Sequence, residues 1–201
     1  MQHNHKRFEQ LADENLLDFV AAGDEQAFAA LLSRHHMRFY HMVYRWVMQA
    51  QDAEDIVQQA FLKLWSGKAR FKKNKGARFT TWFYRILYNQ SMDHLRTRKQ
   101  QFVELNEQIT ASGENQEQDL ALQQDQKQLH AALENLPENQ RIAVQLFYFE
   151  ELKQKDIAQI MGLSVKALES QLSRAKQNLR ERLQVLSAND ETGEMHHVSA
   201  R

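Results

Sequence analysis

Helical periodicity runs through most of this chain, and almost no helix-breaking residue interrupts it. The 201 residues include one proline, Pro137, and six glycines, while Leu, Ala, Gln, Glu and Lys dominate. These five are strong helix formers, and no long segment alternates apolar and polar residues as a half-buried strand does. The sequence therefore predicts an all-helical (all-α) fold, long enough for one large or two small domains.

Apolar spacing and capping residues also predict where the N-terminal helices lie. Two helices are expected over residues 13–22 and 24–48. A third is expected to be capped by Asp52, with Asp55 in its first turn. A fourth is expected to be capped by Thr80 or Thr81 and to end near Lys99. A basic loop, residues 67–78, separates the last two. Four parts are expected: a helical domain over residues 1–99, a flexible acidic linker over 100–126, a second helical domain over 127–186, and a disordered tail over 187–201. Pro137 is expected in the first turn of a helix of the second domain.

Residues 153–183 have the spacing of a helix-turn-helix. A first helix is expected over residues 153–161, with Ile157, Ala158 and Met161 on its inner face. Gly162 suits the sharp turn that follows, and Ser164 is placed to cap the second helix. The apolar stripe of that second helix recurs every three or four residues, at Leu168, Leu172, Ala175, Leu179 and Leu183.

A second helix of this kind fits the major groove of DNA, where its polar side chains meet base edges. The candidate DNA-binding residues here are Ser164, Lys166, Ala167, Ser170, Gln171 and Arg174. An ordinary helical hairpin in a bundle has the same spacing, so this pattern alone leaves both interpretations open.

The net charge of zero hides a strong segregation of charge along the sequence. Residues 62–99 contain eleven Lys or Arg and a single acidic residue, whereas residues 1–61 and 100–163 are net acidic. Basic segments of this density usually contact phosphate, although a solvated loop balanced by acidic helices would show the same pattern. The sequence contains no cysteine, no apolar run of membrane-spanning length and no secretion signal, which favours a cytoplasmic protein without membrane insertion.

Three motifs in order resemble those of bacterial RNA polymerase sigma factors of the extracytoplasmic-function (ECF) class. DAEDIVQQAFLKLW, at residues 52–65, is similar to the polymerase-binding helix, and FTTWFYRILYN, at residues 79–89, is similar to the helix that opens promoter DNA. The Leu-Pro-Glu of residues 136–138 and the LSRAK of residues 172–176 are similar to the C-terminal domain. The resemblance covers about residues 16–186.

The resemblance implies an alternative sigma factor that directs promoter-specific initiation, in response to stress, with no catalytic residue and no cofactor of its own. Its implied partners are the clamp helices and flap of core RNA polymerase, promoter DNA as duplex and as melted single strand, and an anti-sigma factor. The polymerase-binding positions that match the family motif are Asp52, Glu54, Asp55, Gln58, Gln59, Leu62 and Trp65. An exposed Leu62 or Trp65 would contribute strongly to the binding free energy, but either residue would also suit the core.

Residues 67–79 occupy the place of the family's base-capturing loop. The loop's cationic candidates for phosphate contact are Lys68, Arg70, Lys72, Lys73, Lys75 and Arg78, with Phe71 and Phe79 available to pack or stack. On the following helix Arg85, Asn89, Asp93 and Arg96 share one polar face. Asn89 is the best candidate for a base-edge hydrogen bond, whereas Asp93 and Arg96 would equally form an ion pair with each other. Trp82 suits the core or a wedge, and Tyr84 and Tyr88 suit stacking.

The sequence departs from the family pattern in the recognition helix. Lys166 replaces a common glycine, Glu169 follows the central apolar residue, and Gln171 stands where arginine is common. A carboxylate accepts from cytosine N4 and a glutamine pairs with adenine, so we expect an unusual promoter sequence. The acidic linker either mimics nucleic acid near the RNA exit path or is a solvated spacer.

Two other functions were weighed. A helix-turn-helix repressor would bind palindromic duplex DNA as a dimer. A helical nuclease would need clustered carboxylates near the basic surface, where residues 62–99 offer only Asp93. The nine histidines lack the spacing of metal ligands, so the sequence predicts ordinary surface histidines and no metal site.

Overall fold

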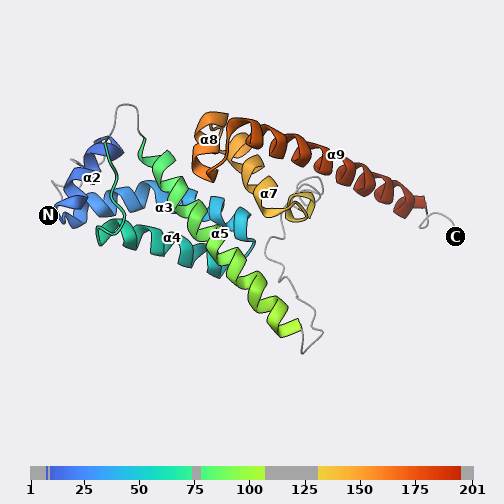
Figure 1. The fold of residues 1–201 in the computed structure, drawn as a ribbon, viewed down its shortest axis with the longest axis horizontal. Coiled ribbons are helices and arrows are strands. Elements are labelled where there is room, and N and C mark those ends of the chain that lie inside the picture. Colours follow the sequence, from blue (N-terminus) through green and yellow to red (C-terminus); the bar gives the residue numbers. More distant parts are fainter. Residues whose placement is uncertain (1–7, 9, 74–77, 107–130, 196–201) are drawn as a thin grey trace. The chain divides into compact units, whose positions relative to one another are not determined.

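The computed structural model describes residues 8, 10–73, 78–106 and 131–195, and every regular element in these ranges is a helix (Figure 1). The predicted all-helical class is therefore confirmed. The chain separates into two compact units, which are described one at a time. No helix in the described ranges has the length and apolar content needed to cross a membrane.

Four helices build the first unit: α2 (Asp13–Ala21), α3 (Glu25–Val47), α4 (Ala50–Trp65) and α5 (Phe79–Asn106). α3 packs on α2 and α4, and α5 packs across α3 and α4 (Figure 1). Phe39 lies at the centre of the core, stacked on Phe83 with ring centroids 4.9 Å apart, and Phe61 contacts Phe83 at 4.8 Å. Large apolar side chains at helical spacing thus hold three helices to one aromatic core.

Two of the expected helix starts in this unit are wrong. α4 begins at Ala50, after Met48 ends α3 in the left-handed conformation, so Asp52 lies in the first turn of the helix and does not cap it. α5 begins at Phe79 and not after Thr80 or Thr81, because Glu14 of α2 accepts the free backbone N–H of Phe79 at 2.9 Å. That long-range partner has no local signature in the sequence.

α5 also ends later than expected, at Asn106, so the first residues of the expected linker continue the helix. Residues 97–106 contain no Gly or Pro, and no local signal stops the helix there. The rest of the expected linker, including its boundary at residue 127, lies outside the described residues.

We call the chain from residue 131 onward the second unit. It contains α7 (Glu138–Val144), the π-helical turn η1 (Gln145–Phe149), α8 (Gln154–Met161) and α9 (Val165–Met195). Leu133, Leu136 and Val144 pack with Ala175 of α9, and Leu172 and Leu179 extend this cluster. Asn178 of α9 donates a hydrogen bond to Gln140 of α7 at 2.9 Å, which satisfies a buried amide. The predicted apolar stripe of α9 is the face that packs.

Three boundaries in this unit differ from expectation. Pro137 is the N-cap of α7 and does not lie in its first turn, and α8 begins at Gln154. α9 continues to Met195, so the backbone of residues 187–195 is helical and the expected disordered tail is wrong for that stretch. Residues 184–195 contain no proline, and the helix continues past the packed stripe.

Candidate polymerase and DNA interfaces

The outer face of α4 remains exposed. Ile56, Val57, Ala60, Phe61 and Leu64 are buried, while Asp55, Gln58, Gln59 and Leu62 face solvent. Leu62 is 60% exposed, so its apolar side chain is accessible to a partner. Trp65 is half-buried against the ring of Phe28, with centroids 5.0 Å apart. Of the two expected anchors, Leu62 is therefore free to contact a partner and Trp65 is partly used in packing.

Two acidic residues at the start of α4 pair with neighbouring helices. Asp52 contacts His94 of α5 at 2.9 Å and Arg98 at 3.8 Å. Glu54 contacts His36 of α3 at 3.3 Å and accepts from Gln58 at 2.8 Å. These two carboxylates therefore help to join α4 to its neighbours, whereas Asp55 is exposed and accepts a hydrogen bond from Gln51 of its own helix at 3.3 Å.

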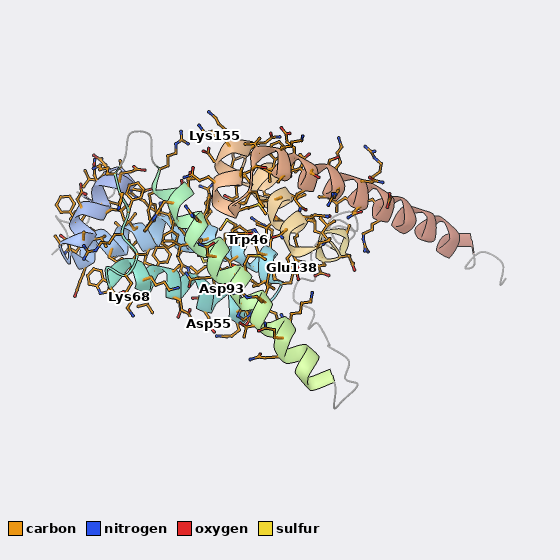
Figure 2. All side chains as sticks on the ribbon, in the orientation of Figure 1. Trp46, Asp55, Lys68, Asp93, Glu138 and Lys155 are labelled. Atoms are coloured by element: carbon orange, nitrogen blue, oxygen red, sulfur yellow. The ribbon has the colours of Figure 1, made fainter. Side chains whose placement is uncertain are left out.

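The basic loop presents most of its described cations to solvent. Lys68, Arg70, Lys72 and Arg78 are exposed, while Lys75 lies outside the described residues. Lys73 differs, because its Nζ donates to Asn15 Oδ1 at 2.9 Å and to Asp18 Oδ2 at 3.2 Å, both on α2. Figure 2 marks Lys68 in this loop, with Asp55 on α4 and Asp93 on α5. The loop therefore exposes a group of cations, one of which, Lys73, is hydrogen-bonded to α2.

The aromatic residues near the loop are more deeply packed than expected. Phe79 and Tyr84 are fully buried in the core, so Phe79 packs and the expected stacking role of Tyr84 is wrong. Both rings lie close to Phe39 of α3, which the helical spacing alone did not place. Phe71 is half-buried and meets Trp82 edge-on with centroids 5.5 Å apart. Tyr88 is half-buried, and burial raises the pKa of its phenol.

One face of α5 carries the four polar residues that the sequence grouped together. Arg85, Asn89, Asp93 and Arg96 are all exposed, as the spacing predicted. Arg96 Nη2 lies 2.7 Å from Asp93 Oδ1, so the ion-pair alternative for these two residues is confirmed. Arg85 and Asn89 are left as the exposed polar side chains closest along the helix to the basic loop.

The predicted helix-turn-helix geometry is present in α8 and α9. Gly162 has a φ of +66°, which glycine adopts without strain, and Ser164 Oγ accepts from Ala167 N at 3.1 Å. Leu168 is fully buried, whereas Lys166, Ser170 and Arg174 are exposed. Ala167 and Gln171 are half-buried on the flank. The candidate reading residues therefore lie on the outer face of α9.

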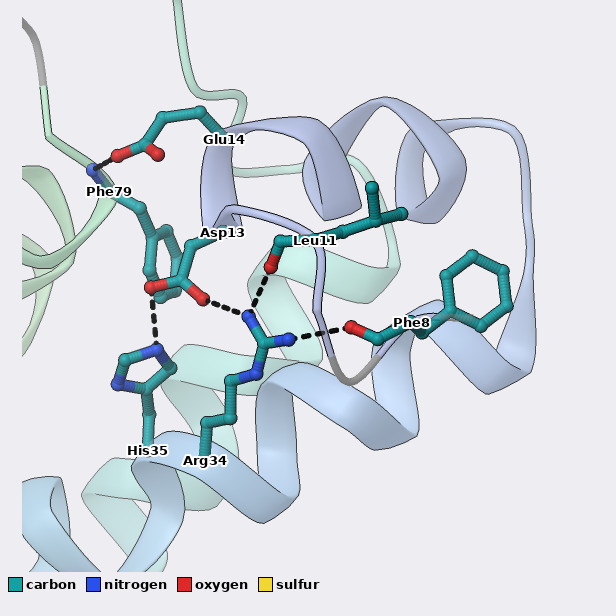
Figure 3. Close-up of polar contacts among 7 residues, drawn as sticks. All are labelled: Phe8, Leu11, Asp13, Glu14, Arg34, His35 and Phe79. Atoms are coloured by element: carbon teal, nitrogen blue, oxygen red, sulfur yellow. Dashed lines mark hydrogen bonds and ion pairs between the residues drawn. The ribbon is translucent and has the colours of Figure 1, made fainter. Parts of the chain in front are cut away.

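A polar network around α2 was missed by the sequence reasoning (Figure 3). Arg34 of α3 donates to Asp13 at 2.8 Å and to the carbonyls of Phe8 and Leu11, both at 2.6 Å. His35 Nε2 lies 2.8 Å from the other oxygen of Asp13. Burial raises the pKa of Asp13, but hydrogen bonds from His35 and Arg34 outweigh it and leave that pKa below its usual value.

The expectation that the histidines are ordinary surface residues is wrong for His35, which is 8% exposed and stacks on Phe39 at 5.3 Å. Its partner Asp13 lies 22 residues away in the sequence, so local spacing gave no signal for the pair. Within the described ranges, no three His, Cys, Asp or Glu side chains gather as metal ligands.

Comparison with known proteins matches both units. The family model for sigma-70 region 2 matches residues 31–101, and that for sigma-70 region 4 matches residues 126–179. The ECF RNA polymerase sigma-E factor of Escherichia coli is 30% identical over 189 residues, which cover 89% of this chain and 97% of that protein. The RNA polymerase sigma-H factor of Pseudomonas aeruginosa is 29% identical over 187 residues, covering 87% and 95% of the two chains.

This chain belongs to the ECF family of RNA polymerase sigma factors. A solved structure of the sigma factor RpoE from Bartonella quintana, in complex with the anti-sigma factor NepR, has a TM-score of 0.63 and is 25% identical over 79% of this chain and 97% of that one. This ECF sigma factor directs transcription initiation as an alternative sigma factor. The two matched regions contain the basic segment and the helix-turn-helix. Membership of this family therefore accounts for both features, and neither a dimeric repressor nor a nuclease is needed to explain them.

Proposed function

We propose that each of the two units of this ECF sigma factor recognises one of the two promoter elements. The first unit, residues 1–99 in the expected division, binds core polymerase, recognises the minus-ten element and holds the opened strand. The second, residues 127–186, reads the minus-thirty-five element. The observation that carries this proposal is that each unit has an exposed polar surface of its own: the basic loop with the outer face of α5 in the first unit, and the outer face of α9 in the second.

On the polymerase side, the exposed part of α4 supports a contact with the clamp helices. Leu62 supplies exposed apolar area, and Asp55, Gln58 and Gln59 surround it with polar groups. An apolar side chain within a polar rim is the usual arrangement of an energetic contact. Asp52 and Glu54 contribute chiefly by fixing α4 against His94 and His36.

On the DNA side, exposed Lys68, Arg70, Lys72 and Arg78 bind phosphates of the opened strand, with Lys75 completing the set that the sequence predicts. Phosphate contacts position the strand, and base contacts specify it. Asn89 is exposed on α5 and supplies a donor and an acceptor for a base edge, beside Arg85. Opening a base costs a few kcal/mol, which these contacts offset.

At the upstream element, Lys166, Ser170, Gln171 and Arg174 meet the major groove, with Ser164 at the N-cap of α9 and Ala167 in its first turn beside the DNA backbone. The half-buried position of Gln171 limits its rotamers and so favours one fixed hydrogen-bonding direction. No step requires a catalytic residue of the sigma factor, because polymerase performs the chemistry.

A protein partner that holds the sigma factor inactive is also proposed. The Bartonella quintana relative was solved with an anti-sigma factor, and CnrH, 25% identical with a TM-score of 0.62, was solved with the cytosolic domain of CnrY. We place the sigma factor in the cytoplasm, where core polymerase and such a partner both meet it.

The direct experiment is reconstitution with core RNA polymerase that carries no other sigma factor. A random-sequence duplex library transcribed by this holoenzyme should yield promoters with an upstream and a downstream element. A dimeric repressor would instead enrich palindromic duplex sites without polymerase, and that result would contradict the proposal.

A further inference from the structure

Lys73, which directly precedes residues 74–77, is hydrogen-bonded to α2. Its ammonium group donates to the amide oxygen of Asn15 at 2.9 Å and to the carboxylate of Asp18 at 3.2 Å. Two acceptors on consecutive turns of one helix fix the direction of a lysine that would otherwise sample many rotamers. Lys73 is exposed, as Lys68 and Lys72 are, and it differs from them in its two hydrogen bonds to α2.

Phe79, which follows residues 74–77 and begins α5, is hydrogen-bonded to the same helix through its backbone. Glu14 Oε1 accepts its backbone N–H at 2.9 Å, and this contact joins residues 65 apart in the sequence (Figure 3). The amide is one of the free donors in the first turn of α5, and a carboxylate at that end is also favoured by the helix dipole. The start of α5 is thereby fixed by a residue of α2, and the ring of Phe79 is buried behind it.

The helix that provides these groups is itself anchored to the core. Asp13 pairs with Arg34 and His35 of α3, each at 2.8 Å, and His35 in turn contacts the ring of Phe79 at 5.3 Å. Leu16, Leu17 and Val20 are buried on the other side of α2. A short helix bound on its apolar face and at its first residue is a rigid support for its remaining polar groups.

We propose that the polar face of α2, formed by Glu14, Asn15 and Asp18, positions residues 67–73 and the start of α5 for the opened promoter strand by holding Lys73 and the amide of Phe79. The matched region 2 begins at residue 31, so α2 lies outside it. The inference rests on the proposed role of the loop in holding single-stranded DNA. Glu14, Asn15 and Asp18 act through the loop and are positioning residues, not DNA contacts.

The test uses holoenzyme assembled from the full-length chain and core polymerase. Glu14→Ala removes the acceptor for Phe79, whereas Glu14→Gln keeps an oxygen at the same place. Asn15→Ala with Asp18→Ala releases Lys73. The readouts are affinity for a single-stranded oligonucleotide of the non-template strand across the downstream element, taken from a promoter that the holoenzyme transcribes, and affinity for core polymerase.

Glu14→Ala and the double variant should each weaken oligonucleotide binding about three- to tenfold, the effect of one or two lost hydrogen bonds. Glu14→Gln should bind nearly as well as the native protein, and core affinity should be unchanged in all of them. Glu25→Ala is the matched control, because Glu25 is an exposed carboxylate at the start of α3. A swap of the pair, Asp18→Lys with Lys73→Glu, should recover binding relative to Asp18→Lys alone.

Lys72→Gln separates this inference from the function on which it rests. If Lys72→Gln weakens strand binding but the α2 variants do not, the inference is overturned and the role of the loop stands. If Lys72→Gln is also silent, the loop does not hold the strand and both fail. Equal losses of strand and core affinity in Glu14→Ala would show that α2 only stabilises the fold, which also overturns the inference.

Discussion

Asp13 shows what a single side chain contributes to the first unit. Its carboxylate accepts from Arg34 and lies within hydrogen-bond distance of His35, and its side chain is 20% exposed. Such charge-assisted bonds are stronger than neutral ones, and removal of the charge leaves the Arg34 guanidinium without its carboxylate, although it still donates to the carbonyls of Phe8 and Leu11. The residue thus links the start of α2 to the middle of α3.

Asp13→Asn should lower the free energy of unfolding of the first unit by about 1–3 kcal/mol at pH 7. The folded pKa of Asp13 lies below its ordinary value of 3.8, so its contribution is complete above about pH 5 and is lost as the pH falls through the folded value. Denaturant titrations followed by tryptophan fluorescence report this unit alone, because Trp46, Trp65 and Trp82 all lie in it. The native and variant curves should converge at pH values below the folded pKa of Asp13, and Asp18→Asn, at an exposed site, should have little effect on stability across the pH range. A difference that stayed constant with pH would contradict the assignment.

Leu62→Ala should weaken binding to core polymerase by about tenfold, as expected for an apolar contact at the centre of an interface, while the thermal unfolding temperature stays the same. The fold is unaffected because the side chain is 60% exposed. Met37→Ala on α3 is the matched control, since Met37 is 58% exposed. Equal losses in both variants would place the polymerase contact elsewhere than on α4.

The turn of the helix-turn-helix was the element that the sequence predicted best. Gly162 adopts a φ of +66°, and Ser164 Oγ caps α9 by accepting from Ala167 N at 3.1 Å, as expected. These devices act between residues two or three positions apart, so a local pattern contains them. The starts of α4 and α5 were missed because a left-handed Met48 and the distant Glu14 decide them. The burial of Tyr84 and Phe79 depends in the same way on three helices meeting at Phe39.

The salt dependence of strand binding should distinguish Lys68 and Lys72 from Lys73, which is hydrogen-bonded to α2. Lys68→Gln with Lys72→Gln should reduce the slope of log affinity against log salt by about 1.4, because each contact with single-stranded DNA contributes about 0.7. Lys73→Gln should change the slope by less, since its ammonium group is engaged by Asn15 and Asp18. The measurement is holoenzyme affinity for the melted-strand oligonucleotide over a range of salt. An unchanged slope in the double variant would mean that the loop is a solvated surface.

At the level of the whole molecule, the two units should fail at different steps of initiation. Gln171→Ala or Lys166→Ala should weaken promoter binding through the upstream element by about 1–3 kcal/mol per lost base contact and leave melting intact on a template that does not need that element. Asn89→Ala should leave that binding intact and slow strand opening, measured by permanganate reactivity. The same defect at the same step in both would contradict the division between units.

α5 also sets where the chain departs from the first unit. From Arg96 to Asn106 the helix advances about 15 Å, since each residue adds about 1.5 Å. The covalent segment from there to Ala131 reaches at most about 85 Å when fully extended. One base pair of extra promoter spacing adds only about 3.4 Å. The reach of this segment alone therefore sets no strict distance between two promoter elements, and we expect any strict spacing preference to come from polymerase holding the two units.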